Sequence, residues 1–129
     1  MATATLVGRE IEEGQRLIDA LNEADLPTDS ALWIYSSDSE TWRLMLTSPT
    51  CDRQGSIQAY REIFSVFHDV EPELKIDWTT LVAVSPTHEL IEGLRQLQLL
   101  WNINLSGKRM TNNMVNEFLV EDGYIYQIK

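Results

Sequence analysis

Few side chains in this chain are suited to acid–base or nucleophilic chemistry. It contains two histidines, His68 and His88, and a single cysteine. His88 is expected in the first turn of a helix, where the helix dipole favours a neutral imidazole of the kind that can serve catalysis. Alternatively, His88 is an ordinary surface residue without a functional role. His68 is expected near the end of another helix, where the dipole favours a cation, and we interpret it as structural.

The cysteine, Cys51, is expected in a loop beside Asp52, whose negative charge opposes formation of a thiolate. We interpret it as a free thiol. The chain has no His-x-Glu-x-x-His or Cys-x-x-Cys spacing and no Gly-x-Ser-x-Gly elbow, and its six glycines are scattered. A zinc site, a serine hydrolase and a phosphate-binding loop require those patterns. We therefore expect no metal and no cofactor, and a non-catalytic protein is favoured over an enzyme.

One carboxylate falls inside a β-rich run, between Asn116 and Phe118. In a covered strand this side chain, Glu117, would need a polar partner. With nearby asparagines it would form the polar floor of a pocket, and a solvent-facing strand is the alternative. The tryptophans are either core residues or walls of a ligand pocket or interface. The hypothetical ligand-binding set is Glu117, Asn113, Asn116, His88 and Tyr126, with Trp33 or Trp78 as a wall.

The chain carries 20 acidic and 10 basic residues, a formal net charge of −10. This charge argues against nucleic acid and anionic membranes as partners, because both are bound by lysine and arginine. The adjacent pair Lys108-Arg109 is interpreted as a loop tip. Residues 1–29 hold seven acidic and two basic residues, half of the acidic excess. That segment is either a solvated helix face or a surface for a basic partner, with Glu10, Glu12 and Glu13 as partner-binding residues.

The expected location is cytoplasmic. A single cysteine excludes an intrachain disulfide and fits a reducing compartment. The first residues lack the basic region of a signal or transit peptide, and no apolar run approaches the ~20 residues of a membrane span.

Apolar periodicity divides the chain into helices and strands. Helices are expected over 6–25 and 56–69, and from a Ser85 cap to near Leu99. Gly14 interrupts the first helix, so it either fits a close packing contact or weakens the helix. Strands are expected over 31–35, 42–47 and 78–84, with 101–105 a short strand or an extended loop. Two C-terminal strands, 114–120 and 124–128, flank Asp122-Gly123, a strong signal for a two-residue hairpin turn.

These elements predict a single α+β domain over residues 1–129. Its order is α-β-β-α-β-α-β-β, with three helices packed on a mostly antiparallel five-stranded sheet. Several strands are apolar on both faces, as in a sheet that is covered on both sides or buried at an interface. The strand order is left open.

Three functions are compatible with this composition. The favoured one is a non-catalytic protein-interaction module that acts as a homodimer. The second is a small-molecule-binding protein or minor enzyme with a pocket between sheet and helices. The third is an acidic inhibitor, of immunity or antitoxin type, whose first helix binds a basic partner.

Overall fold

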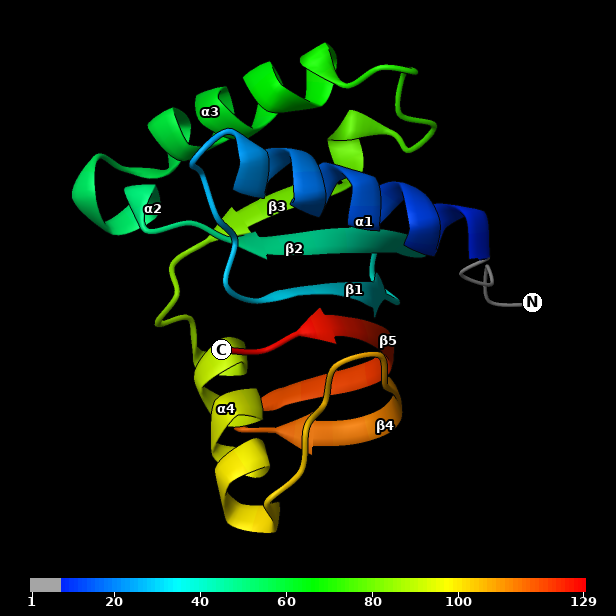
Figure 1. Ribbon diagram of the computed structural model, residues 1–129. Helices are drawn as coiled ribbons and strands as arrows, with labels where there is room; N and C mark the ends of the chain where they lie inside the picture. The colour runs from blue at the N-terminus through cyan, green and yellow to red at the C-terminus, as the bar shows by residue number, and fades with distance from the viewer. Residues whose placement is uncertain (1–7) are drawn as a thin grey trace.

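The computed structural model describes residues 8–129 and contains a five-stranded sheet with helices on both faces (Figure 1). The helices are α1 (Gly8–Glu23), α2 (Thr50–Arg53), α3 (Ser56–Asp69) and α4 (Glu89–Trp101), with a 3-10 turn, η1 (Trp78–Thr80). The strands are β1 (Ala31–Ser36), β2 (Thr41–Thr47), β3 (Leu81–Val84), β4 (Arg109–Val115) and β5 (Phe118–Gln127). Residues 6 and 7 of the predicted first helix lie outside the described residues.

The strand order is β3-β2-β1-β5-β4. β1 is antiparallel to β2 and β5, and β5 is antiparallel to β4, whereas β3 is parallel to β2. The parallel pair arises because α2 and α3 form a crossover between β2 and β3. The predicted α+β class is confirmed. The sheet is mixed, and the short helix α2 is added to the three helices that we predicted.

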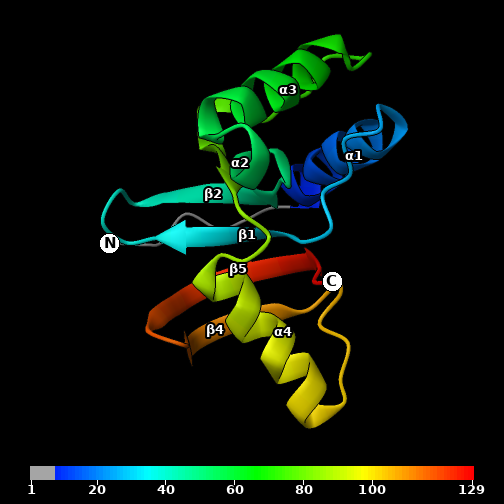
Figure 2. The same cartoon turned by 90° about the vertical axis from the view of Figure 1, so that its left-hand side faces the viewer.

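The two faces of the sheet carry separate apolar cores. Successive residues of β1 point to opposite faces. Ala31 and Trp33 pack with α1 and α3, whereas Leu32 packs with α4 (Figures 1 and 2). The apolar character of both strand faces therefore reflects a sheet covered on both sides, one of the two predicted explanations.

The C-terminal hairpin turns at Asn116-Glu117, and the predicted turn at Asp122-Gly123 is wrong. Asn116 has a φ of 54°, which asparagine adopts more readily than most residues. Gly123 lies inside β5, where it pairs with Ile34 of β1 and Met110 of β4. A side chain there would bring its β-carbon within 3.0 Å of the Trp33 carbonyl oxygen. The glycine thus serves close strand packing and not a turn.

The hairpin is interrupted halfway, and its tip packs against α4. Pairing of β4 with β5 lapses at Asn112, whose φ is 50°. Beyond this point the tip reaches Gly93 of α4, where a β-carbon would lie 2.5 Å from Cγ1 of Val115. The small residue on α4 therefore allows the tip to approach the helix.

Helix α4 begins and ends later than predicted. His88 is its N-cap in place of Ser85, and the Nδ1 atom of His88 accepts a hydrogen bond from the Leu90 backbone at 3.1 Å. The helix continues through Trp101 and ends at Asn102, which adopts a left-handed conformation. The predicted strand or extended loop at 101–105 is a helix end followed by a loop.

Candidate functional site

The structure separates the predicted ligand-binding residues into three places. His88, Asn113, Asn116 and Glu117 lie around the start of α4 and the hairpin tip. Trp33 and Tyr126 lie beneath α1, and Trp78 lies in η1 beside α3. Trp33 and Tyr126 lie on the sheet face covered by α1 and α3, whereas α4 covers the other face, and Trp78 lies in η1. The hairpin turn at 116–117 places Glu117 outside the strands and exposed to solvent.

Around His88, the polar groups fasten the hairpin tip to α4. Asn116 donates a hydrogen bond from Nδ2 to the Glu89 carbonyl at 2.7 Å. The imidazole of His88 lies 5.4 Å from the Phe118 ring, centroid to centroid. Asn113 donates to the carbonyl of Thr111 in its own strand. These contacts are structural, and the exposed Glu117 carboxylate does not form a pocket floor with them.

The buried Trp33 and the half-buried Tyr126 form a chain of hydrogen bonds between the sheet and α1. The Nε1–H of Trp33 donates to Oη of Tyr126 at 2.8 Å, and Oη donates to the Ile11 carbonyl at 2.6 Å. Burial raises the pKa of Tyr126 far above its usual range, so the phenol remains a neutral donor. Trp78, in contrast, is half exposed and meets the edge of Phe64.

The three predicted partner-binding carboxylates differ in exposure. Glu12 is exposed and Glu10 is half-buried, whereas Glu13 is buried. Glu13 accepts hydrogen bonds from Arg16 and from the Lys75 backbone, both at 2.8 Å. The Arg16 hydrogen bond lowers the pKa of Glu13 against the opposing effect of burial. Glu13 therefore holds the segment after α3 against α1, and its carboxylate faces away from any partner.

Glu13→Gln is expected to reduce the free energy of unfolding by about 1–2 kcal/mol at pH 7, because the amide turns one donor towards the Arg16 guanidinium. The folded-state pKa of Glu13 is depressed, so the carboxylate contributes stability above the unfolded pKa of about 4.3. That contribution is lost as the pH falls through the folded pKa. Urea unfolding at pH 7, 5, 4 and 3 measures the difference in the free energy of unfolding between the wild type and the variant.

The difference in the free energy of unfolding between the wild type and Glu13→Gln should become smaller below about pH 4, where the carboxylate becomes protonated. Glu12→Gln is the matched control, since Glu12 is exposed on the same helix and should change stability little at any pH. A difference that is equally large at pH 7 and pH 3 would contradict the assigned role of Glu13.

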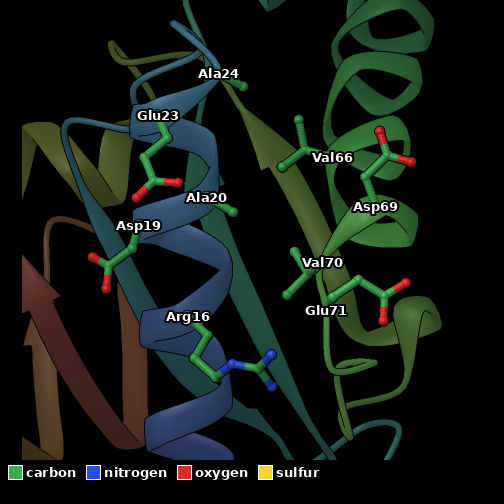
Figure 3. A pocket seen from close by; sticks show the side chains of 9 residues that line it. All are labelled: Arg16, Asp19, Ala20, Glu23, Ala24, Val66, Asp69, Val70 and Glu71. Atoms are coloured by element: carbon green, nitrogen blue, oxygen red, sulfur yellow. The ribbon is translucent and has the colours of Figure 1, made fainter.

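An open groove of about 500 Å³ runs between the second half of α1 and the end of α3. Figure 3 shows Ala20 and Ala24 on its α1 side and Val66 and Val70 on its α3 side, forming an apolar floor. Carboxylates lie along both flanks. Its acidic lining residues are Asp19, Glu23, Asp69 and Glu71.

The electrostatic field of this groove is negative. The one cation among its lining residues, Arg16, is held by Glu13 and by the Pro72 carbonyl. Glu23 and Asp69 are the last residues of α1 and α3, so the negative ends of two helix dipoles add to the carboxylates. The groove thus combines an apolar floor with a surplus of negative charge.

A second, narrower hollow of about 330 Å³ lies between the end of α1, the end of β2, and helices α2 and α3. Its hydroxyl groups are hydrogen-bonded to backbone groups and to a carboxylate. Thr50 donates from Oγ1 to Glu62 at 2.7 Å, and Thr28 donates to the Ser30 carbonyl. Nearby Cys51 is a free cysteine, and burial and Asp52 raise the pKa of its thiol, in line with the predicted lack of thiolate.

The acidic residues of segment 1–29 include Asp19 and Glu23, which line the groove, but the three residues predicted to bind a partner, Glu10, Glu12 and Glu13, lie outside its lining. The α3 flank was not predicted, because helix pairing is a tertiary feature that periodicity does not show. Across residues 8–129 there is no cluster of three or more histidine, cysteine or acidic side chains arranged to hold a metal ion. None of the described helices is long and apolar enough to cross a membrane.

Comparison with known proteins found no matching family model, no matching curated protein and no matching solved structure.

Proposed function

We propose that this chain is a non-catalytic protein-binding module whose α1–α3 groove holds a basic amphipathic helix of a partner protein. The observation that carries the proposal is the apolar floor of the groove between two acidic flanks. An acidic inhibitor of a basic partner is one form of this function.

The dimensions of the groove suit a short helix. Its α1 side runs from Arg16 to Ala24, a rise of roughly 12 Å or about two helical turns. Alanine and valine on the floor leave room for larger apolar side chains of an incoming helix. An amphipathic helix would lay these side chains on the floor and place its lysines and arginines against the flanks.

Long-range electrostatics supports the same type of partner. The chain has a net charge of −10, which attracts a basic segment before contact and repels acidic proteins. The side chains first considered for catalysis have structural roles instead, which is consistent with a binding function. His88 caps α4, Tyr126 bridges Trp33 to α1, and the Cys51 thiol has a raised pKa.

The test uses a fluorescent helical peptide with leucines along one face and lysines on both flanks. Its binding to the full chain is followed by anisotropy. In Glu23→Lys/Asp69→Lys, both new lysines lie at helix C-termini, where the dipole favours cations and folding is not compromised. We expect this variant to bind roughly tenfold more weakly at low salt, and the wild-type affinity to fall as salt rises.

Asp38→Lys/Glu117→Lys is the matched control. It makes the same change in net charge at two exposed turn residues outside the groove lining, and it should keep nearly the wild-type affinity. Equal weakening in both variants would show that only net charge attracts the peptide. That outcome, or no binding by the wild type, would overturn the groove as the binding site.

A further inference from the structure

The end of helix α4 exposes an apolar surface that the fold leaves uncovered. Leu99, Leu100 and Trp101 are 73%, 74% and 70% exposed, and Ile103 in the following loop is 42% exposed. Figures 1 and 2 show the last turns of α4 extending past the sheet. We call these four residues the α4 tip.

The α4 tip is uncovered because the packing of the helix against the second core extends only from Leu90 to Leu97. Leu90, Ile91 and Leu94 are fully buried there, in the second core. The later part of the helix is still held in place. Gln98 donates to the Ile128 carbonyl at 3.0 Å and accepts from the Leu105 backbone at 2.9 Å. The apolar side chains therefore project from an anchored element.

Charge around the α4 tip differs from that of the rest of the chain. Residues 93–116 contain no acidic residue and three basic ones, although the chain has 20 acidic residues. Lys108 ends the loop that follows α4, and Arg109 begins β4, where its guanidinium pairs with Asp122 at 3.4 Å. Two copies with a net charge of −10 could meet at the α4 tip itself, which carries no carboxylate. The centres of protein interfaces are depleted of charge in the same way.

The exposed area is sufficient for a modest dimer. The four side chains present roughly 500 Å² of apolar surface, as large as the biggest apolar patch on a typical monomer. Leu99, Leu100 and Trp101 succeed one another at about 100° around the helix, so a twofold contact buries the part of this area that faces the partner copy. The polar rim, with Gln96, Asn102 and Asn104, adds to the contact, and the total lies towards the lower end of the range for stable interfaces, about 1,200–2,000 Å².

Edge-to-edge sheet pairing through β4, the edge strand that follows α4, is a poorer route to a dimer. The outer edge of β4 presents Thr111, Asn112 and Asn113, all exposed and polar. The left-handed conformation of Asn112 also interrupts the strand. Polar side chains and backbone irregularities of this kind oppose pairing of edge strands.

We infer that the α4 tip is the contact surface of a homodimer, in which the same four residues of two copies pack against each other across a twofold axis. The α4 helix and the α1–α3 groove lie on opposite faces of the sheet. The dimer therefore leaves both grooves open, and one dimer presents two binding sites to a partner. The inference goes beyond the proposed function and stands independently of the groove.

Sedimentation velocity on the full chain from about 1 to about 100 µM tests the dimer. The wild type should shift from 14.8 kDa to twice that mass over this range. Leu99→Lys/Leu100→Lys should remain monomeric throughout. Circular dichroism should show it folded, because both residues are more than 70% exposed. The matched control, Ile57→Lys/Met114→Lys, adds the same charge at two other exposed apolar residues and should still dimerise.

Three results would overturn the inference: a wild type that is monomeric at about 100 µM, a dimer that survives Leu99→Lys/Leu100→Lys, or a control variant that dissociates as fully. A monomer that binds neutral phosphatidylcholine vesicles, and loses that binding in Leu99→Lys/Leu100→Lys, would assign the α4 tip to lipid instead. Failure of the dimer leaves the peptide result unchanged, so the two proposals are tested separately.

Discussion

Replacing Gly14 with alanine is expected to lower the free energy of unfolding by about 2–3 kcal/mol and the melting temperature by roughly 8–12 °C. A β-carbon at this position would lie 2.2 Å from Oη of Tyr126 and 3.1 Å from Nε1 of Trp33. Relief of this clash requires α1 to move off the sheet or Tyr126 to give up its hydrogen bonds. The loss exceeds the ~1 kcal/mol by which alanine is the better helix former. Thermal and urea unfolding measure both quantities.

Two further variants separate the clash from helix propensity. Gly8→Ala makes the same replacement in the same helix, where nothing lies within 4 Å of the new β-carbon, and it should not destabilise the protein. Tyr126→Phe removes the clashing oxygen. In that background, Gly14→Ala should cost at least about 1 kcal/mol less than in the wild type. Equal costs in the two backgrounds would mean that Gly14 does not contact Tyr126.

Gly14 illustrates what sequence can show about this fold. A glycine within an amphipathic helix indicates either a close packing contact or a weakened helix, and the close contact was one of these two predicted explanations. The partner could not be named, because Tyr126 lies more than a hundred residues away and meets Gly14 only once β5 pairs with β1. The sequence therefore indicates the need for space, and the tertiary structure shows which atoms occupy it.

Elements governed by local periodicity were predicted well. The second helix was expected at 56–69, and α3 has those bounds. The expected strand at 31–35 ends one residue before the end of β1, and the expected strand at 42–47 begins one residue after the start of β2. In both cases, apolar spacing and nearby turn residues agree with the tertiary packing, so local and global preferences coincide.

The candidate groove shows a different limit. Acidic residues early in the chain predicted either a solvated helix face or a surface for a basic partner, yet Glu13, one of the three selected, is buried against Arg16 and Lys75. Composition reports how much charge a helix carries but not which side faces a neighbouring helix. The apolar floor also needs Val66 and Val70, which nothing in the sequence singled out.

The sharpest disagreement between sequence and structure is the C-terminal turn, and inserting two glycines at either site tests it. Between Asn116 and Glu117, the insertion should cost about 1 kcal/mol or less, because it lengthens an exposed turn. Between Asp122 and Gly123, it should cost more than about 4 kcal/mol or prevent folding. The residues after the insertion would shift out of register with β1 and β4 together, and Tyr126 would lose Trp33.

The two insertions add the same residues to the same hairpin, so each is the control for the other in thermal unfolding and amide hydrogen exchange. If the insertion after Asp122 were the tolerated one, the hairpin would turn at Asp122-Gly123 and the packing of its tip on Gly93 would be wrong. We expect the insertion after Asn116 to be the tolerated one. An Asp-Gly pair forms a hairpin turn only where the two residues are not themselves paired within a strand. Here β1 pairs with Gly123 on one side and β4 pairs with it on the other. Tertiary pairing thus overrides the strongest local turn signal in the chain.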